Sequence, residues 1–302
     1  MEHLTYLEAI VIGLLQGVTE LFPISSLGHS VLVPAWLGGS WSRLVTQQSS
    51  AESPYLAFIV GLHVATATAL LVLFWRDWVG IVGGFFTSVR HRRIDTTYER
   101  MAWLMVLSTI PAGLTGLLLE HQLRTVFAKP LAAAVFLTIN GVILLTGEWL
   151  RRRALRHPPA MVAHDAAQGA PALDVAIARH VSARDAAVIG VLQTAALLPG
   201  ISRSGITMVA GLLRGLTHEE AVRFSFLLAT PIILAAGVYK VPDLLGPLGN
   251  GIRGQTLAGA AAAFVAALFA AKFLERWFRT RTLTPFAIYC LVAGAISIVH
   301  FA

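Results

Sequence analysis

Charged residues are scarce in this sequence. Asp, Glu, Lys and Arg together make up 13% of its 302 residues, whereas apolar residues make up 56%. A water-soluble domain of this length carries about twice that charged fraction, so a soluble fold is excluded. The apolar residues form six long runs, at 57–75, 101–119, 131–150, 222–240, 255–274 and 284–301. Each run is close to the roughly 20 residues that a helix needs to cross the hydrocarbon core of a bilayer. The sequence therefore predicts an all-α polytopic membrane protein with about six transmembrane helices.

Cysteine is almost absent as well. Cys290 is the single cysteine, which excludes an intrachain disulfide and leaves the redox compartment undetermined. Residues 1–10, MEHLTYLEAI, lack the basic residues that open a cleavable signal peptide, so none is expected.

The basic residues have an uneven distribution. A net charge of +7 would suit a nucleic-acid-binding protein, but the arginines cluster at the ends of the apolar runs, at 90–93, 151–156 and 276–281. Clusters of this kind set the orientation of membrane helices, and contact with anionic lipid headgroups is the less favoured second interpretation. The lipid bilayer, and not a nucleic acid, is therefore the expected partner. The predicted cytoplasmic loops are 76–100, 151–184 and 275–283, and the predicted outer loops, with few basic residues, are 40–54, 120–130 and 241–253.

The chain contains an internal repeat. Residues 8–30 read EAIVIGLLQGVTELFPISSLGHS and residues 185–207 read DAAVIGVLQTAALLPGISRSGIT, so that Gln16 aligns with Gln193 and Gly28 with Gly205. Each copy is an apolar helical stretch interrupted by a proline-containing break, which we call the first break (residues 22–26) and the second break (residues 199–203). Non-helical backbone at membrane depth is tolerated only where it is buried in protein or lines a polar cavity. Two broken segments in corresponding halves therefore indicate a site at the repeat interface.

The arginine clusters also predict how the broken segments lie. If the second one crossed the membrane fully, Arg276, Arg279 and Arg281 would lie outside, against the distribution of positive charge. Two re-entrant hairpins avoid this, the first entering from outside and the second from the cytoplasm, with their tips meeting near the midplane. We thus expect a single membrane domain over 1–302, with inverted-topology repeats at about 1–150 and 185–302 joined by the cytoplasmic loop 151–184.

The second break predicts an anion site. Arg203 stays charged and offers a planar fork that suits phosphate oxygens, and a helix that restarts there would direct free N–H groups at the same place. An arginine inside a membrane segment is a functional residue by default; the alternative is that Arg203 pairs with a buried carboxylate and only locks the hairpin. The other residues expected to bind the anion are Gly200, Ser202, Ser204, Gly205 and Thr207.

The first break supplies carboxylate, hydroxyl and imidazole groups. Gln16 and Glu20 share one helical face, and their oxygens together with phosphate oxygens could hold a divalent cation, Mg²⁺ or Ca²⁺. A hydroxyl beside an imidazole is a common pairing for an activated nucleophile, so Ser26 and His29 are the candidate catalytic pair. Ser25 is expected to contact the substrate.

These motifs resemble those of the bacterial undecaprenyl-diphosphatase family, the integral-membrane type associated with bacitracin resistance. The resemblance rests on residues 16–20 (QGVTE), 23–29 (PISSLGH) and 199–207 (PGISRSGIT), and it extends across nearly the whole chain. Leu27 stands where the family usually has threonine, and the loop at 151–184 is longer than typical.

The resemblance implies a reaction, a place and a set of roles. The reaction is hydrolysis of a C55 polyprenyl diphosphate to the monophosphate and inorganic phosphate, which recycles the carrier lipid of the cell wall. The place is the bacterial cytoplasmic membrane, with the active site opening to the extracytoplasmic side. Arg203 and the hydroxyls of the second break would bind the diphosphate, and Glu20 would hold the metal or position a proton. Ser26, assisted by His29, would attack phosphorus or orient a water molecule that does.

Several alternatives stay open at this stage. Inverted repeats with re-entrant hairpins are also transporter architecture, so a flippase or a carrier of a phosphorylated substrate is the second interpretation. The sequence does not choose between covalent and direct hydrolysis, between prenyl chain lengths, or between a monomer and a homodimer.

Overall fold

The computed structural model describes residues 4–46, 54–119, 129–155, 173–246 and 249–302, and within these ranges the chain is helical and contains no strand. Six of the described helices are long and apolar enough to cross a membrane. They are α4 (Pro54–Leu73), α6 (Thr97–Leu118), α8 (Pro130–Leu155), α13 (His218–Leu245), α14 (Arg253–Trp277) and α15 (Thr284–Phe301). The predicted class, an all-α polytopic membrane protein with six spans, is confirmed.

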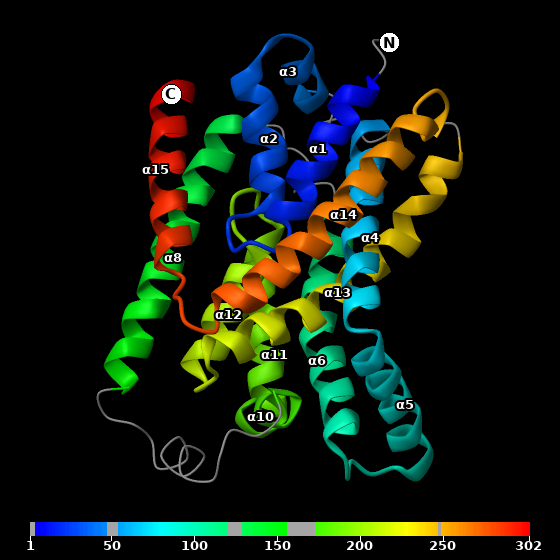
Figure 1. Ribbon diagram of the computed structural model, residues 1–302, viewed down its shortest axis with the longest axis vertical. Coiled ribbons are helices and arrows are strands. Elements are labelled where there is room, and N and C mark those ends of the chain that lie inside the picture. Colours follow the sequence, from blue (N-terminus) through cyan, green and yellow to red (C-terminus); the bar gives the residue numbers. More distant parts are fainter. Residues whose placement is uncertain (1–3, 47–53, 120–128, 156–172, 247–248) are drawn as a thin grey trace.

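Two broken helical hairpins accompany the spans. The first hairpin consists of α1 (Tyr6–Thr19) and α2 (Ser26–Leu37); the second consists of α11 (Ala183–Leu192), a 3₁₀ turn at Gln193–Leu197, and α12 (Arg203–Leu213). In Figure 1 the first hairpin occupies the upper half of the molecule and the second the lower half, and their connecting segments approach each other between the spans. That the two halves are related by inversion stays a prediction.

The two breaks are in direct contact. Gly28, at the start of α2, lies so close to Gly200 that a Cβ on Gly28 would be 2.9 Å from the Gly200 Cα. Gly200 has a φ of 111°, a conformation open to glycine and costly for residues with a Cβ. Its backbone N–H donates to the Ser25 hydroxyl at 3.1 Å. The contact therefore depends on glycine in both hairpins.

Asn140 of α8 connects the two breaks from the side. This side chain is fully buried. Its Oδ1 accepts from the backbone N–H of Ser202 at 2.9 Å, and its Nδ2 donates to the carbonyl of Pro23 at 2.9 Å. One amide thus satisfies a donor from the second break and an acceptor from the first, groups that would be costly to bury unpaired.

Three of the predicted loops contain helices. Segment 76–100, expected as a cytoplasmic loop, forms α5 (Trp75–His91) before the turn into α6; segment 40–54 carries most of α3 (Gly39–Thr46), and segment 151–184 carries α10 (Leu173–His180). The charged residues of α5 lie at its two ends, and the uncharged stretch between Asp77 and Arg90 is shorter than a membrane span, so α5 escapes a search for long apolar runs. It packs on α6 through Gly84, where a Cβ would meet the Tyr98 backbone at 2.7 Å. Residues 156–172 of the expected linker lie outside the described residues.

Candidate active site

The two breaks border a cavity of about 250 Å³. The first hairpin contributes Glu20, Ser25 and Ser26 to its wall, and the second contributes Ser202 and Arg203. The rest of the wall comes mainly from apolar side chains of α4, α13 and the 3₁₀ turn, among them Leu56, Ile59, Leu197, Ile232, Ile233 and Ala236. A small polar cluster thus faces an otherwise apolar cavity, the lining expected for a ligand with a charged head and a hydrocarbon tail.

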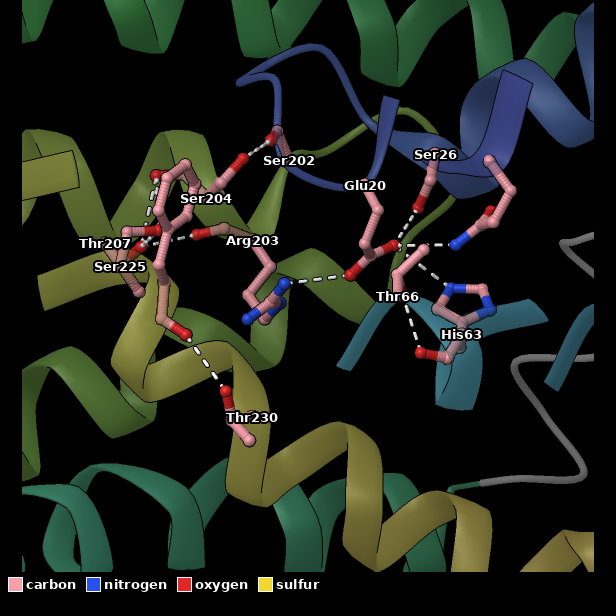
Figure 2. Close-up of polar contacts among 12 residues, drawn as sticks. Glu20, Ser26, His63, Thr66, Ser202, Arg203, Ser204, Thr207, Ser225 and Thr230 are labelled. Atoms are coloured by element: carbon pink, nitrogen blue, oxygen red, sulfur yellow. Dashed lines mark hydrogen bonds and ion pairs between the residues drawn. The ribbon is translucent and has the colours of Figure 1, made fainter. Parts of the chain in front are cut away.

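Glu20 is the centre of the polar cluster (Figure 2). It follows the last residue of α1 and is 7% exposed. Its Oε2 accepts from the Ser26 hydroxyl at 2.5 Å and from Gln16 Nε2 at 3.0 Å. Its Oε1 accepts from Arg203 Nη2 at 2.8 Å. The structure therefore brings Gln16, Glu20, Ser26 and Arg203 together, although Arg203 is 183 residues away in the chain.

Arg203 opens α12 and is mostly buried, with 14% of its side chain exposed. One nitrogen, Nη2, pairs with Glu20, while Nη1 is buried and has no hydrogen-bond partner among the described residues. The buried ion pair that the sequence left open as an alternative is therefore present, but it uses only one of the two terminal guanidinium nitrogens. A buried donor without a partner is costly, and a phosphate oxygen is the type of acceptor that Arg binds best.

The small and hydroxyl residues of the second break divide into two groups. Ser202 lines the cavity and caps α12, accepting from the Gly205 N–H at 3.1 Å. Ser204 instead donates to the Phe22 carbonyl at 3.0 Å, and Thr207 bonds Ser225 at 2.7 Å; neither hydroxyl lines the cavity. Ser202 therefore lies on the cavity wall, and its contact with substrate stays a prediction, whereas Ser204 and Thr207 hold the hairpin to its surroundings.

Gly200 and Gly205 also allow the second break to pack closely against α8. A Cβ on Gly205 would meet the Leu144 side chain at 3.1 Å, and one on Gly200 would meet the α8 backbone at 2.5 Å. Neither glycine lines the cavity. Both let the second break approach α8, and direct contact with substrate stays a prediction for them.

Ser25 joins the two hairpins at the cavity wall. Its φ of 71° is unusual for a residue other than glycine, and strained backbone of this kind persists where the surroundings enforce it. The hydroxyl accepts from the N–H of Gly28 at 3.2 Å and of Gly200 at 3.1 Å. Ser25 therefore fixes the relative position of Glu20 and Arg203.

His29 does not meet Ser26 in the structure. Its Nδ1 bonds the Ser25 carbonyl at 2.7 Å, its Nε2 bonds the Tyr289 hydroxyl at 2.7 Å, and its ring stacks on Tyr289 of α15. This corrects the expected Ser26–His29 pairing: the imidazole is directed to α15, and the Ser26 hydroxyl donates to Glu20 instead. His29 does not line the cavity, and a catalytic role for it stays a prediction.

A different histidine, His63 of α4, lies in the cluster. Its Nε2 is 3.2 Å from Glu20 Oε2, and its Nδ1 bonds the Ile59 carbonyl at 2.8 Å. His63 also lines the cavity. His63 escapes a search for breaks in the sequence because it lies inside an uninterrupted apolar run. The available signal was the ionisable side chain itself, which within a membrane segment points to function.

The cluster offers few ligands for a metal ion. Among the described residues there is no group of three or more His, Cys, Asp or Glu side chains placed to hold one. Glu20 offers a carboxylate, and Gln16 turns its amide nitrogen toward that carboxylate. Mg²⁺ is commonly bound by one or two carboxylates together with substrate phosphates and water. Glu20 is thus the residue that would hold a divalent cation, with substrate and solvent as its further ligands, and the cation stays a prediction.

Comparisons with known proteins agree on one family. Residues 9–296 match the family described as Bacitracin resistance protein BacA. The chain is 62% identical over 302 residues to an undecaprenyl-diphosphatase of Mycolicibacterium paratuberculosis, covering 99% of this chain and 98% of the relative. It is 56% identical to undecaprenyl-diphosphatase 2 of Frankia alni, covering 100% and 99%. It is 42% identical to undecaprenyl-diphosphatase 2 of Chromobacterium violaceum, covering 97% of both chains.

Proposed function

Because the chain belongs to the bacitracin resistance protein BacA family, we propose that it hydrolyses undecaprenyl diphosphate to undecaprenyl phosphate and inorganic phosphate, which returns the carrier lipid to cell-wall synthesis. The relatives named above carry the name undecaprenyl-diphosphatase. The observation that carries the proposal for this chain is the meeting of Glu20 with Ser26 and Arg203 in one cavity. A carboxylate, a hydroxyl bonded to it and a guanidinium are the groups that phosphoryl transfer needs.

The catalytic cycle begins with substrate binding. The terminal phosphate of the diphosphate enters the cavity and binds the Arg203 fork, including Nη1, for which the described residues supply no hydrogen-bond partner. Ser202 and Ser25, both on the cavity wall, lie within the same region. Arg203 then stabilises the negative charge that builds up on the phosphoryl oxygens and on the leaving phosphate.

Ser26 is the proposed nucleophile and Glu20 its base. Glu20 takes the hydroxyl proton of Ser26 as Oγ attacks the terminal phosphorus. The bond between phosphorus and the bridging oxygen breaks, and undecaprenyl phosphate leaves with the electron pair. Glu20 passes its proton to the departing undecaprenyl phosphate, which restores the carboxylate. A water molecule then attacks the phosphoserine and gives a proton to Glu20. The bond between phosphorus and Ser26 Oγ breaks, Glu20 returns the proton to Oγ, and inorganic phosphate leaves. If Ser26 instead orients the water, Glu20 deprotonates that water directly.

Gln16 and His63 support the base. Both lie within hydrogen-bond reach of Glu20 Oε2 from different helices, α1 and α4. They keep the carboxylate oriented once Arg203 moves onto the substrate. A bound Mg²⁺ or Ca²⁺ held by Glu20, Gln16 and phosphate oxygens would add neutralisation of the diphosphate charge.

The position of the cavity supports access from the extracytoplasmic side of the bacterial cytoplasmic membrane. Its α4 residues lie in the first half of that helix, and its α13 residues lie past the middle of theirs. Those helix ends adjoin segments 40–54 and 241–253, the segments with few basic residues. By the positive-inside rule these segments face outward.

The test is phosphate release from undecaprenyl or farnesyl diphosphate by the detergent-purified protein. Arg203→Ala and Ser26→Ala should each lower kcat by about 10²-fold or more. The matched control is Ser30→Ala: Ser30 lies one turn further along α2, bonds the Leu27 carbonyl and does not line the cavity. Near-normal turnover by Arg203→Ala would overturn the assignment of the site.

Two further experiments separate covalent from direct hydrolysis and a cation-dependent from a cation-independent reaction. Acid quenching during turnover should trap phosphoserine in the wild type and none in Ser26→Ala; absence of phosphoserine from an active enzyme indicates direct attack by water. EDTA should abolish release if a cation is required, with recovery on adding Mg²⁺ or Ca²⁺. A folded wild type that releases no phosphate would favour the carrier function instead.

A further inference from the structure

A second hollow is lined almost entirely by apolar side chains. It is a groove of about 420 Å³ between α5, α6 and α13, and we call it the α6 groove. Its wall contains Trp78, Phe85, Met105 and Pro231. Thr109 also lines it, but the Thr109 hydroxyl donates to the Met105 carbonyl at 2.7 Å. The groove therefore presents a nearly pure hydrocarbon surface.

The α6 groove adjoins the active-site cavity along one face of α6. Ala102, Met105 and Thr109 line the groove, and Ala112 lines the cavity. Spacings of three, four and three residues keep these four side chains on one helical face. On α13 the change from groove to cavity occurs between Pro231 and Ile232. The lining residues of the groove and of the cavity thus follow one another along α6 and α13, and we call this line of residues the seam.

The direction of the seam suits a lipid whose phosphates are in the cavity. The groove residues lie nearer the start of α6, at Thr97, and the cavity residue nearer its end, at Leu118. From Ala102 to Ala112 the seam spans about 15 Å at the rise of an α-helix. A headgroup that enters the cavity from the side of the α6 end therefore has its hydrocarbon chain directed along the groove.

We propose that the α6 groove binds the isoprene units that follow the one attached to the diphosphate of the polyprenyl substrate. The proposal rests on the proposed diphosphatase function and adds to it the site that recognises the chain. A prenyl chain gains little hydrophobic free energy when it moves from lipid into an apolar groove, because the bilayer is equally apolar. The groove acts instead by orientation, holding the chain so that phosphorus is in line with Ser26.

Substitutions that fill the groove provide the test. Val106→Phe places a ring in the groove from a partly buried position, and Leu114→Phe is the matched control on α6, where the side chain is 56% exposed and lines neither hollow. Val106→Phe should lower kcat/KM about tenfold for farnesyl and undecaprenyl diphosphates and leave isopentenyl diphosphate, a single isoprene unit, unchanged. Leu114→Phe should change none of the three.

The results that would contradict the groove proposal differ from those that would contradict the diphosphatase activity itself. Equal losses on all three substrates, or no loss on any, would overturn the groove proposal while leaving a working diphosphatase. Loss of all release in the wild type would overturn the proposed function.

A second measurement does not depend on turnover. A photoreactive farnesyl diphosphate analogue should label peptides of α6 and α13, and undecaprenyl diphosphate should prevent the labelling. Labelling that phospholipid prevents and undecaprenyl diphosphate does not would mean that the groove holds bulk lipid, and it would overturn the proposal.

Discussion

Substitution of Gly28 by alanine tests whether the contact between the hairpins sets the activity. An ideal Cβ on Gly28 lies 2.9 Å from the Gly200 Cα and 3.0 Å from the Gly200 N, whereas ordinary contact begins at 3.4 Å. Both neighbours are backbone atoms, which cannot rotate away. The breaks must therefore separate by about 0.5 Å, and overpacking of this kind costs about 1–3 kcal/mol of stability.

The effect on catalysis should exceed the effect on stability. Glu20 belongs to the first hairpin and Arg203 to the second, and their 2.8 Å pairing spans the contact that Gly28→Ala opens. Because a displacement of about 1 Å in a catalytic group can cost 10²-fold, we expect phosphate release to fall by about 10- to 100-fold. The purified variant should still unfold cooperatively in detergent, at a lower temperature than the wild type.

A second glycine provides the control. Gly83 lies on α5, and a Cβ there would meet no atom within 4 Å. Gly83→Ala should therefore keep full activity and gain up to about 1 kcal/mol from better helix propensity. Wild-type kcat/KM in Gly28→Ala would refute the reasoning, because it would mean that the site tolerates separation of the breaks.

Two further substitutions address the residues that hold the cluster. Asn140→Leu leaves the Ser202 N–H and the Pro23 carbonyl without their partner. Because each buried unpaired group costs about 1–3 kcal/mol of stability, the unfolding temperature of the variant should drop clearly. An unchanged unfolding temperature would contradict the bridging role. His63→Leu should lower kcat more than KM changes, while His63→Gln, which can still donate to Glu20, should recover part of the loss; equal kcat values for the two variants would exclude a positioning role.

Much of the fold is predictable from the sequence because the bilayer restricts it so strongly. A span must be long, apolar and internally hydrogen-bonded, so each apolar run marks a helix. The observed α4, Pro54–Leu73, and α15, Thr284–Phe301, lie within three residues of their predicted ranges. α5 was missed because Asp77 and Arg90 bound an uncharged stretch that is too short for a membrane span. Its helix packs against α6.

The residues of the site that lie next to the two breaks were predicted from the sequence, and those within uninterrupted helices were missed. Glu20 and Arg203 border proline-containing interruptions, which in a membrane segment require a purpose. His63 and Asn140 lie within uninterrupted helices, far in sequence from their partners. His63 is 43 residues from Glu20, and Asn140 is 62 residues from Ser202. Only the fold brings them to the breaks. The same holds for His29, whose partner Tyr289 lies 260 residues away.

In the mechanism proposed above, the Glu20–Arg203 pair links substrate binding to activation of the base. An arginine buried before substrate arrives needs a counter-charge, since an unpaired buried charge costs several kcal/mol. When the diphosphate takes over that role, Glu20 is released to accept the Ser26 proton. Glu20→Gln should therefore bind a non-hydrolysable farnesyl diphosphate analogue at least as tightly as the wild type, because a competitor for Arg203 is gone, while turnover falls about 10²-fold or more. Loss of binding in proportion to turnover would instead show that Glu20 holds a cation needed for the diphosphate to bind.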